Sequence, residues 1–251
     1  MRRLDGKVAA VTGAARGLGR RLCEALVREG ARVAMLGRDL GALQDAARGF
    51  GAAALPLRCD VADPQQVAAA FAALAALAER CGGLDLLVNN AAIGQLLPVG
   101  EADPAQVEYE VKVNLLGPMH CIGAALPLMR RRGGGDVFNI SSESVLRPYP
   151  MLGVYAATKS GLETLSRSLR AELRDQGIRV GVLRVGRMQE SGFNRGWPPA
   201  LRARYLEIVA REGFHAASGE PIRPAVVADT LIDLACLPRE AQVELVELRP
   251  A

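Results

Sequence analysis

Seven short apolar runs alternate with longer stretches of helical pattern along the 251 residues of the chain. Strands that alternate with helices are typical of a parallel sheet that is covered by helices on both faces. The alternation therefore predicts one doubly wound α/β domain with a seven-stranded parallel sheet. The predicted strands are Val8–Thr12, Arg32–Leu36, Ala54–Arg58, Leu84–Asn89, Asp136–Ile140, Arg179–Val185 and Val243–Leu248.

The chain reads as one domain, residues 1–251, because no linker rich in Pro, Gly or Ser divides it and no internal repeat is present. One segment, residues 187–220, interrupts the alternation after the sixth predicted strand. Because ligands of open α/β sheets bind beyond the carboxyl ends of the strands, we expect a small substrate-covering lobe here. Packing onto the core is the alternative for each of its aromatic residues. These residues are Phe193, Trp197, Tyr205 and Phe214, four of the ten aromatics in the chain.

Composition and charge exclude several classes of protein. Half of the residues are apolar, which excludes a fully disordered chain. The net charge of +4 is spread along the sequence, and its densest run, Arg130–Arg132, is followed by Gly133–Gly135. That pattern is typical of a helix end, where cations meet the negative end of the dipole and glycine forms the cap. We therefore expect no nucleic-acid partner.

The cysteines and the apolar runs indicate in which compartment of the cell the protein is found. The five cysteines are scattered and lack the spacing of a metal site, so they read as buried thiols in a reducing compartment. The longest apolar run, Ala68–Ala78, is too short to cross a bilayer. We expect a soluble cytoplasmic protein without a metal site or a membrane partner.

The stretch TGAARGLG, Thr12–Gly19, follows the first predicted strand and opens a helix. Glycines in such a loop permit a tight turn and let backbone N–H groups approach a pyrophosphate at the positive end of the helix dipole. The order of strand, loop and helix predicts a Rossmann-type dinucleotide-binding part over about residues 1–140. The expected contacts are Gly13, Ala15, Arg16, Gly17, Leu18 and Gly19.

The end of the second predicted strand favours one dinucleotide. Enzymes that select NAD usually place an acidic residue there to bind the ribose 2′-hydroxyl. Here the position is Gly37, followed by Arg38, and both Arg38 and Arg16 match a 2′-phosphate. We therefore predict NADP(H), while Asp39, one residue further on, leaves NAD(H) open.

The next two strands end in further candidate contacts of the cofactor. An aspartate after the third strand can accept from the adenine amino group, and small residues after the fourth let the backbone run beside the adenosine ribose. Asp and Asn at strand ends also commonly cap the next helix, so the order of the signals along the chain carries this prediction. The residues are Asp60, Val61, Asn90, Ala91 and Ala92.

A serine, a tyrosine and a lysine are expected at the same sheet edge. Ser142 comes just after the fifth predicted strand, and Tyr155 and Lys159 lie one helical turn apart. Lys159 is one of only three lysines among 31 basic residues. A free tyrosine has a pKa of about 10, so we expect Lys159 and a positive nicotinamide ring to lower it. Ser142 is then expected to hold the carbonyl or hydroxyl oxygen during proton exchange.

In this order, TGAARGLG, NNAA, Asn114 in VKVN, NISS and YAATK resemble the motifs of the short-chain dehydrogenase/reductase family, over nearly the whole chain. The resemblance implies hydride transfer between a nicotinamide and a carbonyl or alcohol carbon, in a homodimer or homotetramer. It implies that Tyr155 is the general acid or base and Ser142 the oxygen anchor. Lys159 would tune Tyr155 and bind the nicotinamide ribose, and Asn114 would hold a helix open for a proton-relay water.

The sequence departs from the family pattern in three places. NNAA replaces the usual NNAG, and the last strand runs into Arg-Pro. Val185 replaces the usual proline before Gly186, and Glu190 replaces an expected threonine. In the family, the loop that contains Val185 and Glu190 normally contacts the nicotinamide carboxamide. The resemblance therefore implies that Gly186 and Met188 contact the cofactor, with an altered loop geometry.

The candidate substrate contacts lie near the lobe. Arg184 and Arg187 could bind a substrate carboxylate, or could support the lobe through acidic neighbours such as Glu190. His215 could also touch the substrate. The expected contacts of the substrate are Ser144, Tyr149, Phe193 and Trp197.

The motifs together predict an NADP(H)-dependent oxidoreductase that acts on a ketone or secondary alcohol of partly apolar character. An NAD-linked secondary alcohol dehydrogenase is the alternative within the same class. A dinucleotide-binding regulatory protein without turnover is the alternative from a different class.

Overall fold

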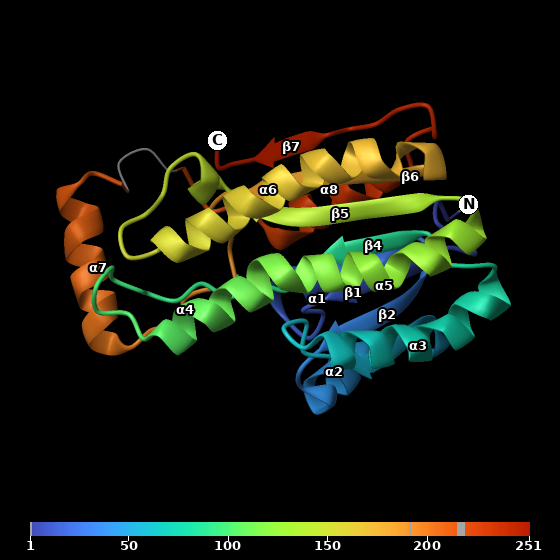
Figure 1. The fold of residues 1–251 in the computed structure, drawn as a ribbon, viewed down its shortest axis with the longest axis horizontal. Helices are drawn as coiled ribbons and strands as arrows, with labels where there is room; N and C mark the ends of the chain where they lie inside the picture. The colour runs from blue at the N-terminus through green and yellow to red at the C-terminus, as the bar shows by residue number, and fades with distance from the viewer. Residues whose placement is uncertain (1, 191, 215–218) are drawn as a thin grey trace.

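The computed structural model describes residues 2–190, 192–214 and 219–251. Within them, seven parallel strands form one sheet in the order β3-β2-β1-β4-β5-β6-β7 (Figure 1). This confirms the predicted fold class, and it brings all carboxyl ends of the strands to one edge. The strands are β1 (Val8–Thr12), β2 (Arg32–Gly37), β3 (Ala54–Arg58), β4 (Leu86–Asn89), β5 (Gly135–Ser142), β6 (Ile178–Val185) and β7 (Leu245–Leu248).

Helices cover both faces of the sheet. One face carries α1 (Gly17–Arg28), α2 (Leu40–Ala47) and α8 (Pro224–Ala235). The other, which faces the viewer in Figure 1, carries α3 (Pro64–Cys81), α5 (Gly117–Arg132) and α6 (Gly153–Leu173). Two further helices, α4 (Pro104–Val111) and α7 (Pro199–Arg211), lie beyond the carboxyl ends of the strands. Among the described residues, none of these helices is long and apolar enough to cross a membrane.

The predicted strand boundaries hold within two residues, and the differences have local reasons. Leu84 is outside β4 because its N–H group donates to the carbonyl oxygen of Leu128 in α5. β5 continues to Ser142 because its last residues remain paired with Arg184 and Val185 of β6. Ser142, expected just after the strand, is therefore its last residue and is positioned by the sheet.

The basic run ends α5 as predicted. Arg130–Arg132 form its last turn, and Gly133 caps it with a φ of 82°. Two of these arginines also have carboxylate partners, Arg131 with Glu79 at 3.1 Å and Arg132 with Asp85 at 2.8 Å. The run therefore contributes to local packing at the end of a helix.

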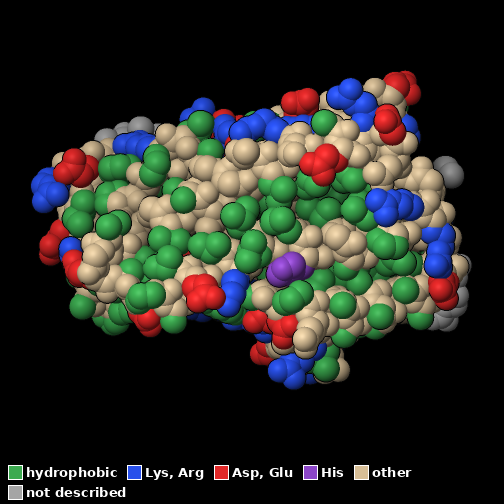
Figure 2. All heavy atoms as spheres, in the orientation of Figure 1, with side chains coloured by type: hydrophobic (Ala, Val, Ile, Leu, Met, Phe, Trp, Pro, Cys, Tyr) green, Lys and Arg blue, Asp and Glu red, His purple; other side chains and the backbone are tan. Residues whose placement is uncertain are grey.

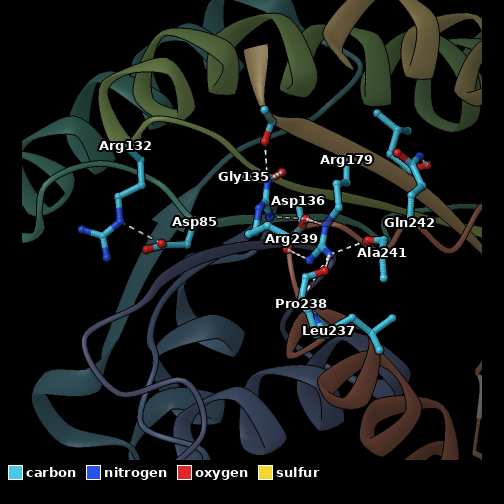
Figure 3. Close-up of polar contacts among 12 residues, drawn as sticks. Asp85, Arg132, Gly135, Asp136, Arg179, Leu237, Pro238, Arg239, Ala241 and Gln242 are labelled. Carbon is cyan, nitrogen blue, oxygen red and sulfur yellow. Dashed lines mark hydrogen bonds and ion pairs between the residues drawn. The ribbon is translucent and has the colours of Figure 1, made fainter. Parts of the chain in front are cut away.

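Asp136 anchors an arginine network at the amino edge of the sheet (Figure 3). Arg179 reaches it with two nitrogens, Nε to Oδ1 at 2.6 Å and Nη2 to Oδ2 at 3.0 Å. The remaining nitrogen of this fork, Nη1, donates to three backbone carbonyl oxygens of the segment 237–241. Arg239 donates to Asp136 at 2.9 Å. The network thus ties the segment between α8 and β7 to β5 and β6.

Replacement of Arg179 is expected to destabilise the fold more than replacement of Arg239. The Arg179 side chain is 13% exposed and donates to Asp136 and to three backbone carbonyl oxygens, whereas that of Arg239 is 51% exposed. We expect Arg179→Met to lower the free energy of unfolding by about 3 kcal/mol, because the nearly buried Asp136 carboxylate loses two of its hydrogen bonds and, among the described residues, keeps only that from the exposed Arg239. Urea unfolding of both variants measures the difference. An equal loss in Arg239→Met would contradict the role given to Arg179.

Candidate active site

The glycine-rich loop between β1 and α1 makes contacts that only glycine allows. Gly13 and Gly17 have φ values of 66° and 53°, in the left-handed region. A Cβ atom on Gly19 would overlap the carbonyl oxygen of Gly13. The N-cap residue of α1, Arg16, makes no side-chain cap, and the first turn holds no acidic residue. The first N–H groups of α1 are therefore suited to an anion.

Thr12 joins the glycine-rich loop to the loop after β4. Its hydroxyl accepts hydrogen bonds from the backbone N–H groups of Asn90 at 3.0 Å and Ala91 at 2.9 Å. The side-chain amide of Asn90 donates in return to the carbonyl oxygen of Thr12 at 2.9 Å. Asn90, a predicted cofactor contact, thus positions two loops against each other.

Arg38 and Asp60 lie on either side of the Tyr109 hydroxyl. Arg38 donates to this hydroxyl at 2.7 Å, and the hydroxyl lies 3.0 Å from Asp60 Oδ2, to which it donates. Arg38 is exposed after β2, and its direct partner here is a phenol rather than a carboxylate. Asp39, the alternative ribose contact, accepts from the N–H group of Ala42 as the N-cap of α2.

The remaining predicted cofactor contacts lie in the loops or first helical turns that follow β1, β3, β4 and β6. Their side chains differ in exposure, so some could contact a ligand only through the backbone. Leu18 and Val61 are buried, Ala15, Ala91 and Met188 are half-buried, and Ala92 is exposed. Among the described residues, no group of three His, Cys, Asp or Glu side chains could hold a metal ion.

Ser142, Tyr155 and Lys159 converge at the carboxyl end of β5. The side chain of Ser142 forms a hydrogen bond with Tyr155, which lies in the first turn of α6. The Nζ atom of Lys159 is 5.8 Å from the centre of the Tyr155 ring and donates to the carbonyl oxygen of Ile140 at 2.8 Å. Tyr155 is 9% exposed and Lys159 is 2% exposed. The sheet and one helix therefore bring the three predicted side chains together in a nearly dry site.

Buried polar contacts hold α6 against the sheet. The Ser141 hydroxyl donates to Glu163 Oε1 at 2.7 Å. The amide of Asn139 donates to the Ser166 hydroxyl at 2.9 Å, and Asn89 on β4 donates to Asn139 at 2.8 Å. These bonds fix the rotation of α6 about its axis, which decides where Tyr155 and Lys159 point.

Burial changes the proton affinity of both reactive groups. It raises the pKa of Tyr155 to about 12, while the hydrogen bond with Ser142 opposes the rise. Burial also lowers the pKa of Lys159 to about 8. The lowering of the Tyr155 pKa by Lys159 and a positive nicotinamide ring together stays a prediction, because in the polypeptide alone the phenolate loses hydration on burial.

Asn114 lies in a π-helical turn, η2 (Lys112–Leu116), between α4 and α5. Its Oδ1 accepts from the N–H group of Ile93 at 2.9 Å, and its Nδ2 donates to the carbonyl oxygen of Ile93 at 2.8 Å. Nδ2 also donates to the Thr158 hydroxyl at 3.2 Å. π turns widen a helix and occur often at functional sites. The helix is thus widened at Asn114, and the proton-relay water that the resemblance implied stays a prediction.

Two carboxyl groups near Tyr155 were not predicted. Glu110 in α4 is fully buried, and Glu143 in the turn after β5 is half-buried. The charge of each raises the pKa of Tyr155. A Cβ atom on Gly186 would lie 2.9 Å from Glu143 Oε2, so this carboxylate lies against the loop after β6. The available signals were weak: Glu143 directly follows the NISS motif, and Glu110 comes one helical turn before Asn114.

The segment 187–220 covers Tyr155 with aromatic rings. The centre of the Phe193 ring lies 4.9 Å from that of Tyr155 and 5.8 Å from that of Trp197. Trp197 Nε1 donates to the carbonyl oxygen of Gly94 at 2.7 Å, and the Phe193 ring fills the space that a side chain on Gly94 would need. Tyr205 is buried in the packing of this segment, whereas Phe193 lies against the reactive tyrosine, and a substrate-covering role for the segment stays a prediction.

The other candidate substrate contacts lie at different places. Ser144 is buried, and its hydroxyl has no hydrogen-bond partner among the described residues. Tyr149 is half-buried and shares a hydrogen bond with Glu143. Arg187 is exposed and donates to a backbone carbonyl oxygen of the lobe. His215 lies outside the described residues.

Arg184 does not reach toward a substrate. Its guanidinium group contacts Glu163 of α6 at 2.7 Å and Glu247 of β7 at 3.1 Å, and 11% of its side chain is exposed. The alternative that it binds a substrate carboxylate is wrong, because both partners are carboxylates of the scaffold. Glu190, expected to pair with it, instead lies 3.8 Å from Arg21.

The model of the short chain dehydrogenase family matches residues 7–199. This match spans the glycine-rich loop, the π turn and the Ser142, Tyr155 and Lys159 site. The chain belongs to the short-chain dehydrogenase/reductase family. As a member, it is an oxidoreductase that acts on CH–OH and C=O groups, which sets aside the alternative of a regulatory protein without turnover.

Two curated relatives and one solved structure are similar to this short-chain dehydrogenase/reductase over most of its length. It is 38% identical to sorbitol dehydrogenase of Cereibacter sphaeroides, over 73% of this chain and 71% of that protein. It is 34% identical to galactitol 2-dehydrogenase of Agrobacterium fabrum over the same shares. A metagenomic short-chain oxidoreductase, solved in complex with NADP, is 29% identical over 99% of both chains, with a TM-score of 0.79.

The close approach at Gly19 predicts opposite effects for two glycine-to-alanine substitutions in helices of this dehydrogenase/reductase. Gly19→Ala places a methyl group on the carbonyl oxygen of Gly13 and is expected to cost about 2 kcal/mol of unfolding free energy. Gly123, on the exposed side of α5, has open space around it, so Gly123→Ala is expected to add about 1 kcal/mol. Urea unfolding measures both, and a stabilising Gly19→Ala would refute the contact.

Proposed function

We propose that this protein is an NADP(H)-dependent oxidoreductase that transfers hydride between the nicotinamide and a ketone or secondary alcohol. One observation carries the proposal: Ser142, Tyr155 and Lys159 meet at the carboxyl edge of the sheet, beside the glycine-rich loop. The hydroxyl, the phenol and the ammonium there can bind an oxygen atom and exchange a proton with it.

The residues present fit a dinucleotide. Glycines keep the space between the loop and α1 clear of side chains, and the first N–H groups of α1 lack a side-chain cap. Gly13, Gly17 and Gly19 would hold the pyrophosphate, and Lys159 would bind the nicotinamide ribose. When bound, the dinucleotide supplies or accepts a hydride at the nicotinamide C4.

Arg16 and Arg38 support NADP(H) over NAD(H). Both guanidinium groups are exposed at the carboxyl edge, and neither forms an ion pair with a carboxylate among the described residues. Asp39, which would serve the ribose 2′-hydroxyl of NAD, already caps α2. The NADP complex of the similar metagenomic oxidoreductase supports the same choice. NAD remains the second candidate, because one oxygen of Asp39 can still accept.

Tyr155 would move the proton. In ketone reduction its phenol O–H donates to the carbonyl oxygen, and in alcohol oxidation its phenolate accepts the hydroxyl proton. The Ser142 hydroxyl would donate to the same oxygen and stabilise the negative charge that develops there. Because burial alone raises the pKa of Tyr155, its lowering in the working enzyme depends on the positive charges of Lys159 and the oxidised nicotinamide together.

The side chains around Tyr155 support a substrate of partly apolar character. Phe193 and Trp197 present aromatic rings near the reactive oxygen, and Tyr149 and Ser144 add hydroxyl groups. We propose these four side chains as substrate contacts. The names of the two curated relatives, which act on sorbitol and galactitol, favour a substrate with several hydroxyl groups as the second candidate.

We further propose that the protein is a homodimer or homotetramer. Hydrophobic side chains gather on the face that carries α5 and α6 (Figure 2). Exposed apolar residues there include Leu116, 36% exposed, and Met119, 46% exposed. Apolar surface of this kind typically becomes buried between subunits.

Removal of the phenol hydroxyl tests the reaction. Tyr155→Phe is expected to reduce turnover of a ketone panel at least about a hundredfold, because general acid catalysis is lost. NADPH affinity is expected to stay nearly unchanged, since the ring remains. Tyr205→Phe, which removes a hydroxyl from the lobe packing, is the matched control and should keep its activity. Activity retained in Tyr155→Phe would contradict the assignment of Tyr155 as the residue that transfers the proton.

Removal of the charge after β2 tests the cofactor choice. Arg38→Asp is expected to weaken NADPH binding relative to NADH by about tenfold or more, because a charge-assisted hydrogen bond to the 2′-phosphate is lost. Fluorescence titrations with both dinucleotides measure the ratio. Arg48→Asp, an exposed site at the end of α2, is the charge-matched control. An unchanged ratio in Arg38→Asp would mean that another residue reads the phosphate.

A further inference from the structure

Glu110 is a buried acid that the assigned chemistry does not use. It lies in α4, one helical turn before Asn114, and no part of it is exposed. Its Oε2 accepts a hydrogen bond from the backbone N–H group of Gln95 at 2.9 Å. Its Oε1 is buried and has no hydrogen-bond partner among the described residues. A neutral amide could make the one bond that is formed, so holding the loop does not account for a carboxyl group here.

The surroundings of Glu110 contain the reactive groups of the site. α4 packs against η2 and against α6, the helix that carries Lys159 and Tyr155, and the charge of Glu110 acts on both of these groups. The charged group of η2, Lys112, is exposed and is paired with Glu108 instead. Glu143, from the turn after β5, acts on Tyr155. Lys159 is therefore the cation on the packed elements whose charge acts on Glu110.

Lys159 needs a countercharge in this environment. Its Nζ atom is buried and donates to one carbonyl oxygen, that of Ile140. Isolated ammonium groups in a dry interior tend to lose their proton. Among the described residues, one carboxylate oxygen of Glu110 has no hydrogen-bond donor, and the buried ammonium of Lys159 has a single acceptor. The negative charge of one group can therefore offset the positive charge of the other.

We propose that Glu110 is a positioning residue for proton transfer, a buried countercharge that keeps Lys159 protonated beside Tyr155. The inference deepens the proposed function and rests on it. Burial raises the pKa of Glu110 to about 7 and lowers that of Lys159 to about 8, and the charge of each opposes the shift of the other. Above pH 7, Glu110 is ionised and its charge favours the ammonium form of Lys159. The same charge disfavours the Tyr155 phenolate.

Glu110→Gln is expected to move the pH dependence of the reaction as a whole. Without the negative charge, the pKa of Lys159 falls further and the pKa of Tyr155 falls too. Both limbs of the kcat/KM profile for alcohol oxidation should then shift by about one unit to lower pH, as expected for the loss of a buried charge that acts on both groups. Glutamine can still accept the Gln95 hydrogen bond, so the fold should be retained. Glu108→Gln, an exposed site on the same helix, should leave the profile in place.

Infrared titration of the protein without substrate provides a second readout. The difference spectrum between wild type and Glu110→Gln should contain the C=O stretch of a protonated carboxyl group that disappears near pH 7. A carboxyl that stays protonated well above pH 7 would overturn the proposal, because it would carry no charge to offset the ammonium of Lys159. So would a Glu110→Gln enzyme with an unshifted profile and a uniform loss of kcat, which indicates a structural role only. Failure of the wild type to turn over any alcohol or ketone would refute the proposed function. The infrared titration of wild type and Glu110→Gln would still show at which pH Glu110 ionises.

Discussion

The docking of α6 onto β5 is the constraint on which the site depends. Ser142 belongs to the strand, whereas Tyr155 and Lys159 belong to the helix. The three side chains therefore meet only when α6 has one rotation about its own axis and one position along that axis relative to β5. Buried polar bonds from Asn139 and Ser141 to the facing side of the helix impose both. Hydrophobic contacts alone would tolerate small rotations, whereas a hydrogen bond at 2.7 Å in a dry interface is lost when the helix turns. The polar layer therefore sets the position of the reactive groups.

That layer requires charges to be buried and then satisfied. Glu163 is compensated by Arg184, which Glu247 of β7 also holds, so the last strand of the sheet supports the helix that carries Tyr155. Lys159 and Glu110 lack such complete compensation, since each makes a single hydrogen bond within the described residues. The scaffold charges are thus paired, and the charges beside the reactive phenol remain free to change protonation state. Groups that change protonation near neutral pH belong at such a site.

The sequence predicted the sheet and most of the site because both depend on local patterns and on one topological rule. Apolar runs gave the strands, and parallel pairing then forced the segments after β1, β4 and β5 to one edge. The glycine-rich loop was predictable for a similar reason, since left-handed φ values and the contact of Gly19 with Gly13 admit almost no other residue. The scaffold role of Arg184, the effect of burial on the pKa of Tyr155 and the buried carboxyl of Glu110 could not be predicted in this way. Each depends on which side chains from distant elements surround the group and on how much water they exclude.

By itself, the sequence determined that this chain forms a parallel α/β sheet with a dinucleotide loop and a serine, tyrosine and lysine at its carboxyl edge. Spacing along a strand or helix is enough for that, because backbone geometry is the same in every protein. Only the tertiary structure decided that Arg184 is a scaffold residue, that Phe193 lies against Tyr155, and that Glu110 is buried in a helix that packs against the helix of Lys159. Protonation and pairing depend on desolvation and on distances between elements far apart in the chain, and those exist only once the core has closed.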